Sequence, residues 1–179
     1  MIDESAKDNL HRRLRRDREE ALLWKLDGLS EYDAHRPLTA TGTNLLGLAK
    51  HLANVEARYF GEVFDRPSPK PLPRWQDHSN GSDLWATEDE TRDQIIGVYR
   101  RTWEHSDATI NELPLDAPGH VPWWPEPYPN TNMFAIMVHV LGQSIQHAGH
   151  ADILRDTPLT LSTIAVRIDP VLAPRVTTV

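Results

Sequence analysis

The spacing of apolar residues along the chain predicts four helices. In each of four segments, apolar side chains recur every three or four positions, which places them on one face of a helix. The segments cover residues 5–29, 43–64, 87–113 and about 131–155. Thr87, with Glu90 three residues later, matches a capping box and predicts the start of the third helix. Alternation typical of strands is absent before residue 159, so the pattern predicts an all-α four-helix bundle.

Two long connections separate these helices. Four prolines fall within residues 66–73, a composition that neither a helix nor an inner strand tolerates. Residues 114–130 join the third helix to the fourth and include Trp123 and Trp124. Large aromatic side chains in a long loop usually pack down as a lid or an interface. We therefore expect Trp123 and Trp124 to cover a substrate pocket, together with Tyr59 of the second helix.

The chain continues beyond the predicted bundle. We assign residues 1–157 to the bundle and residues 158–179 to a C-terminal extension in which apolar residues alternate weakly. Because these apolar residues follow a core that is already complete, they must cover either their own bundle or a partner subunit. A symmetric homodimer is the commonest outcome of the second arrangement, and we expect one here.

Composition narrows the class of protein. With 39% hydrophobic and 25% charged residues the chain is expected to fold, and no apolar run is long enough to span a membrane. The charged N-terminal segment has no apolar signal core, so we expect a cytoplasmic protein without a membrane partner. The net charge of −7 argues against a nucleic-acid partner, and the basic run at residues 12–18 is expected to be a solvated helix face. No cysteine is present, so any thiol chemistry must use the thiol of a substrate.

The candidate chemistry lies in the histidines. At 100° per residue, one polar column on the fourth helix contains His139, Gln143, His147 and His150, at the edge of the apolar face. On the second helix, His51 shares a face with apolar core positions. The bundle is therefore expected to bring imidazoles from two helices into its interior.

Imidazoles that meet in a core require partners for their ring nitrogens. A single histidine on an apolar face is usually a core residue bonded to a carbonyl or hydroxyl group, and several together could also line a polar, water-filled core. A metal ion is the stronger hypothesis, because packed rings repel one another when charged and neutral imidazole is a natural metal ligand. Three nitrogen and oxygen ligands would leave an open, catalytic position, with Zn²⁺ as the default and Ni²⁺, Mn²⁺ or Fe²⁺ as alternatives. Asp152 and Glu56 point elsewhere on their helices; either could support a ligand, although a surface charge is the simpler expectation for Glu56.

Three motifs are distinctive: TNLLGLAKHLANVEARYF at 43–60, VPWWPEP at 121–127 and MVHVLGQSIQHAGHADILRD at 137–156. Together they resemble the DinB-like superfamily, in its mycothiol S-transferase-like branch. The resemblance covers roughly residues 10–156, with the motifs in the order and at the separations of that branch.

The resemblance implies a four-helix bundle with one divalent metal, held by His51 and by Gln143 and His147 four residues apart. Similar chains commonly carry Glu or His at the position of Gln143. Since an amide oxygen is a weaker ligand, His150 or His139 could substitute for it, or the site could have lost catalytic power.

The activity implied is metal-dependent transfer of a low-molecular-weight thiol, such as mycothiol, to a small electrophilic metabolite. Two alternatives remain. One is a metal-assisted isomerase or hydrolase of a small metabolite on the same scaffold, and the other is a catalytically inactive, small-molecule-binding bundle.

Overall fold

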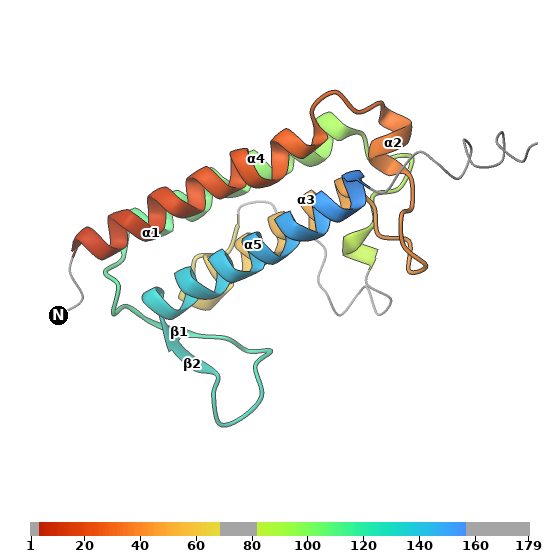
Figure 1. Cartoon of the computed structure of the whole chain (residues 1–179). Helices are drawn as coiled ribbons and strands as arrows, with labels where there is room; N and C mark the ends of the chain where they lie inside the picture. The colour runs from red at the N-terminus through yellow and green to blue at the C-terminus, as the bar shows by residue number, and fades with distance from the viewer. Residues whose placement is uncertain (1–3, 69–81, 157–179) are drawn as a thin grey trace, which may run out of the picture.

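The computed structural model describes residues 4–68 and 82–156, and it is mainly helical (Figure 1). The long helices are α1 (Glu4–Arg16), α3 (Leu45–Tyr59), α4 (Arg92–Glu112) and α5 (Met133–Asp156). Shorter helical elements are η1 (Asp17–Leu22), η2 (Leu23–Leu26), α2 (Glu31–His35), η3 (Glu62–Phe64) and η5 (Ser82–Leu84). Two short antiparallel strands, β1 (Pro118–His120) and β2 (Asn130–Asn132), pair just before α5.

The long helices form the expected bundle, so the all-α fold class is confirmed. Helix α3 is buried along almost its whole length and contacts both α4 and α5, while α5 also packs on α1 and η1. Helix α1 lies along α4, where His11 Nε2 donates to Asp107 Oδ1 at 2.8 Å and Lys7 Nζ donates to the Asn111 carbonyl at 3.3 Å. Figure 1 shows the hairpin at one end of the bundle and α2 at the other.

The first predicted helix is a continuous rod whose hydrogen bonding changes twice. It begins as the α-helix α1, becomes a π-helix in η1 and tightens to a 3₁₀-helix in η2. π-Helical turns are rare and turn the side chains that follow them to a new direction. Here the π-helical turn carries Asp17 and Arg18, both of which are buried.

Arg18 forms a buried ion-pair network that joins three helices. Its guanidinium donates to the two carboxylate oxygens of Glu56 on α3 at 2.9 and 2.7 Å, and to Asp107 of α4 at 2.6 Å. Burial alone would lower the pKa of Arg18, but the two carboxylates outweigh it and raise that pKa, so the guanidinium stays charged. The expectation of a solvated face is wrong for Arg18, and the expectation of a surface charge is wrong for Glu56. Spacing along one helix does not reveal that a neighbouring helix supplies the opposite charge.

Helix ends and connections depart from the sequence prediction at three places. Helix α4 is capped by Thr91, whose capping box with Gln94 replaces the predicted one at Thr87; Thr87 and Glu90 form a turn instead. The short helix α2, capped by Ser30, was not predicted. The β1–β2 hairpin was also missed, because three-residue strands are too short to show alternation.

Two further predictions concern segments that the structure describes only in part or not at all. The C-terminal extension, with the homodimer inferred from it, lies outside the described residues, as does most of the proline-rich connection. Over residues 4–68 and 82–156, no helix combines the length and the apolar character that crossing a membrane requires.

One close backbone approach positions the segment next to the histidines. Asn44 caps α3 and its side chain also bonds to the backbone of Ala86, which draws residues 84–86 onto the first turn of the helix. At Gly47 this contact leaves no room for a side chain, since a Cβ would lie 2.0 Å from the Leu84 carbonyl oxygen.

We predict that Gly47→Ala destabilises the fold by about 3 kcal/mol, because the clash is with backbone atoms that cannot rotate away. Gly142→Ala is the matched control. A Cβ there meets nothing within 4 Å, and alanine is expected to stabilise α5 by up to about 1 kcal/mol. Urea unfolding of both variants measures the two effects, and equal stabilities would contradict the close approach.

Candidate functional site

The bundle brings the rings of His51 on α3 and His147 on α5 into edge-on contact. Their ring centroids lie 4.6 Å apart with the rings inclined at 62°. Both positions are consequences of helix packing, because α3 and α5 contact each other and each histidine lies on the side of its helix that faces the other. The pairing expected from the two helical faces is therefore present in the structure.

Asp83 orients the first of these rings. The Nδ1–H of His51 donates to Asp83 Oδ2 at 2.6 Å, and Asp83 is itself buried on the short element η5. A carboxylate on Nδ1 fixes the neutral tautomer in which Nε2 carries the lone pair, as is usual for histidines that bind metals. Sequence reasoning missed Asp83. It lies 32 residues from His51 along the chain, in a loop without periodicity, and no local pattern connects the two.

His147 is held neutral. Burial of the ring, and then the neighbouring His51 and His150 rings, lower the pKa of His147 to about 4. At neutral pH the ring therefore has a lone pair on one nitrogen, and protons do not compete for it. A neutral, buried imidazole beside a second oriented imidazole is the type of donor set that binds divalent transition metals.

The other predicted site residues on α5 lie at different distances from this pair. His150 is exposed and follows one turn after His147, with 3.3 Å between their Nδ1 atoms. Gln143 lies one turn before His147 and is half-buried; within the described part of the chain its amide makes no hydrogen bond. Asp152 is paired with Lys25 and more than half exposed, so it supports a contact with η2 rather than the histidines.

His139 belongs to a different cluster, at the hairpin end of the bundle. Its ring packs 4.5 Å from that of Tyr59, and Trp124 lies 5.5 Å away. The indole N–H groups of Trp123 and Trp124 both donate to the Tyr59 hydroxyl, at 3.2 and 3.1 Å. His139 and His147 are separated by eight residues, or about 12 Å along the helix. The three aromatic residues predicted to line a substrate pocket are therefore in contact with one another, two turns away from the histidine pair.

A cavity of about 310 Å³ adjoins the histidines of α5. His147 and His150 line it, together with Leu48, Leu84 and the end of α5 at Ile153 and Leu154. A small molecule that enters this cavity would meet two imidazoles and otherwise a mainly apolar wall.

The donor set stops short of a complete metal site in this arrangement. Among the histidines and carboxylates of residues 4–68 and 82–156, no three lie so that one ion could be held between them. Two imidazoles from different helices fit a metal, and the amide oxygen of Gln143, one turn before His147, is a further candidate donor.

Comparison with known proteins identifies the family of this chain. No curated protein matches the chain. The protein-family model described as mycothiol-S-transferase matches residues 9–158, a span that runs from α1 past the end of α5 and includes every residue of the site described above. Because the match covers most of the 179 residues, the chain belongs to the mycothiol-S-transferase family of DinB-like proteins.

Proposed function

We propose that this protein is a metal-dependent transferase that conjugates a low-molecular-weight thiol, mycothiol or a close relative, to a small electrophile. The single observation that carries the proposal is the His51–His147 pair, two neighbouring imidazoles of which one is oriented by a carboxylate and the other is held neutral by burial. Membership of the mycothiol-S-transferase family points to mycothiol as the thiol substrate. The protein has no cysteine and therefore no thiol of its own.

The metal would be held by His51, His147 and the amide oxygen of Gln143. Imidazole nitrogens suit Zn²⁺, Ni²⁺ and Fe²⁺, and an oxygen donor is also compatible with Mn²⁺; Zn²⁺ is the default. When bound, such an ion supplies positive charge that lowers the pKa of a thiol beside it and so favours the thiolate.

The protein's own residues prepare the site for this chemistry. Asp83 holds the His51 ring at a fixed angle, and burial keeps His147 unprotonated at neutral pH. The apolar wall of the cavity reduces competition from water. In the transfer, the thiol gives its proton to solvent, its sulfur forms a bond to an electrophilic carbon, and the leaving group departs with the electron pair of the bond that breaks.

The electrophile would lie on the side of the tryptophans. Tyr59 and His139 lie two turns along the same two helices from His51 and His147, at the same interface between α3 and α5. Trp123 and Trp124 are half-buried in this cluster, where their rings would cover an electrophile bound beside Tyr59.

A second candidate is a small-molecule-binding bundle without catalytic activity. The observations that favour it are the neutral amide at position 143 and the lack, among the described histidines and carboxylates, of three convergent ligands. A metal-assisted isomerase or hydrolase would use the same pair of histidines and differ in the substrate and in the reaction.

We predict that the Zn²⁺-loaded protein conjugates mycothiol to a generic electrophile such as monochlorobimane, and that a chelator removes the activity. Loss of free thiol and formation of the conjugate, followed by liquid chromatography, measure it. Tight mycothiol binding without conjugate would favour the inactive bundle.

In the same assay, Trp124→Ala is expected to raise the KM for the electrophile severalfold while the metal affinity stays unchanged. An unchanged KM would show that the tryptophans do not contact the electrophile.

We predict that His51→Ala and His147→Ala each weaken Zn²⁺ binding at least tenfold, because each removes one of two anchoring nitrogens. Asp83→Asn is expected to weaken it by roughly tenfold as well, the usual cost of losing the partner of a metal ligand. His120→Ala is the control, since His120 is exposed on β1 and bonds to Asn130. Isothermal titration calorimetry gives the affinities; parent-like binding by both His51→Ala and His147→Ala would refute the site.

We predict that Gln143→Glu tightens Zn²⁺ binding by roughly tenfold, because a carboxylate adds a negative charge and a stronger oxygen donor. His150 is the nearest alternative third ligand. Two nitrogens on one tetrahedral zinc ion lie about 3.3 Å apart, which is the separation of His147 Nδ1 and His150 Nδ1. Unchanged affinity in Gln143→Glu, combined with a loss in His150→Ala, would transfer the third position to His150.

A further inference from the structure

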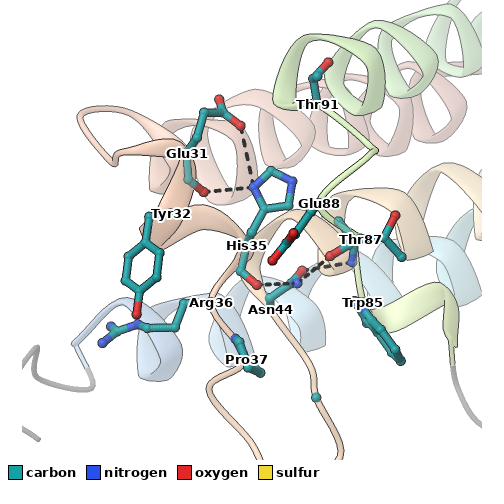
Figure 2. A pocket seen from close by; sticks show the side chains of 12 residues that line it. Glu31, Tyr32, His35, Arg36, Pro37, Asn44, Trp85, Thr87, Glu88 and Thr91 are labelled. Carbon is teal, nitrogen blue, oxygen red and sulfur yellow. Dashed lines mark hydrogen bonds and ion pairs between the residues drawn. The ribbon is translucent and has the colours of Figure 1, made fainter.

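A second, larger cavity lies at the α2 end of the bundle and plays no part in the site described so far. Its volume is about 960 Å³, and Figure 2 shows the side chains around it. We call it the α2 cavity; its lining includes Tyr32, Arg36, Asn44, Trp85, Glu88 and Thr91.

Hydrogen bonds from two side chains hold the wall of the α2 cavity in place. The Asn44 amide nitrogen donates to the carbonyls of His35 and Ala86 at 2.8 and 2.9 Å, so that one buried side chain joins α2 to the segment before α4. The His35 ring makes a second connection, with one nitrogen 2.8 Å from the Glu31 carbonyl and the other 2.9 Å from the Glu90 carbonyl. A cavity held open in this way is largely preformed, as ligand sites usually are.

Two charged side chains in this cavity have no partner in the described part of the chain. The Arg36 guanidinium makes no hydrogen bond or ion pair there, and its Nε is buried without an acceptor. The Glu88 carboxylate is exposed, and it has no hydrogen-bond donor or cation as a partner among residues 4–68 and 82–156. A buried donor without an acceptor costs free energy, so the cavity offers a ligand the unused Arg36 donor, and the exposed Glu88 carboxylate adds an acceptor.

Two aromatic side chains are also unusually exposed at the cavity. Tyr32 is 73% exposed and Trp85 is 47% exposed, and Figure 2 shows them on opposite sides, with Arg36 beside Tyr32 and Glu88 between the two. Exposed aromatic rings that face a cavity provide flat apolar surfaces for a ligand ring.

These features select a class of ligand. An anion would meet the carboxylates of Glu31 and Glu88, and a cation would meet Arg36. An apolar molecule would bury the guanidinium and the carboxylate without partners. A neutral, ring-shaped polyol suits the guanidinium, the carboxylates and the aromatic rings together. Its hydroxyl groups both donate and accept hydrogen bonds, and its ring C–H groups can lie against the aromatic faces.

The α2 cavity and the histidine cavity share a wall. Thr43 and Leu84 line the histidine cavity, whereas the next residues, Asn44 and Trp85, line the α2 cavity. The Asn44 N–H donates to the Leu84 carbonyl at 3.3 Å, which holds the two strips of wall together. Asn44 precedes His51 by seven residues, or about 10 Å of helix, a distance that one elongated ligand can span.

We propose that the α2 cavity binds the hydroxyl-rich, sugar-type arm of the thiol whose sulfur acts at His51 and His147. The inference rests on the proposed function and adds the part of the thiol that gives specificity. A thiol that lacks the arm would reach the histidines without gaining the contacts to Trp85 and Glu88.

Calorimetric titration of the Zn²⁺-loaded protein tests this with two thiols, mycothiol and N-acetylcysteine, which lacks the sugar-type arm. The wild type is expected to bind mycothiol at least tenfold more tightly than N-acetylcysteine. Trp85→Ala should remove most of that preference, and Glu88→Gln should reduce it severalfold, while both leave the affinity for N-acetylcysteine unchanged. Trp24→Ala is the matched control, because Trp24 is 48% exposed and packs against Lys25 elsewhere on the bundle.

Equal affinities for the two thiols in the wild type, or an undiminished preference in both Trp85→Ala and Glu88→Gln, would overturn the inference. Binding of free N-acetylglucosamine as tight as that of mycothiol would also overturn it, by showing that the cavity serves a free sugar. These outcomes are separate from a failure of the proposed function, in which mycothiol binds with the expected preference and no conjugate forms.

Discussion

The buried contact of Arg18 with Glu56 and Asp107 is the constraint on which the rest of the structure depends. A charged guanidinium and a charged carboxylate, both fully buried, are tolerated only as a pair, and breaking such a pair typically costs about 3–5 kcal/mol. The bidentate geometry fixes the rotation of α3 about its own axis. Glu56 faces η1 and α4, and since His51 lies about 140° around α3 from Glu56, the same rotation directs His51 toward α5.

The segment from Asp83 to Ala86 connects helix α3 to both cavities. It rests on the first turn of α3 because Gly47 has no side chain and Asn44 bonds to Ala86. Successive residues of this segment then contact different parts of the molecule. Asp83 orients His51, Leu84 lines the histidine cavity and Trp85 lines the α2 cavity. A disturbance of this contact would therefore reach the histidine pair and the α2 cavity together.

Where sequence reasoning failed, the missing information was contact between distant segments. Arg18 belongs to a basic run that looks solvated, and its burial follows from a π-helical turn and two carboxylates that lie 38 and 89 residues away. Thr87 satisfies the local rule for a capping box, yet Thr91 satisfies it equally and is the residue at which the chain turns into α4. Asp152 shares a helix with the histidines but is paired with Lys25 of η2.

The sequence by itself determined the helical fold, the family and the two helices that carry the histidines. These follow from periodicity and from local motifs, which depend on residues within a few turns of one another. Only the tertiary structure decided that Asp83 contacts His51, that His139 lies with the tryptophans rather than with His147, and that a second cavity adjoins the first. The physical reason is that a side chain's neighbours across a helix interface are set by how the helices rotate and slide against each other. That packing depends on the sum of many long-range contacts and leaves no periodic pattern in the chain.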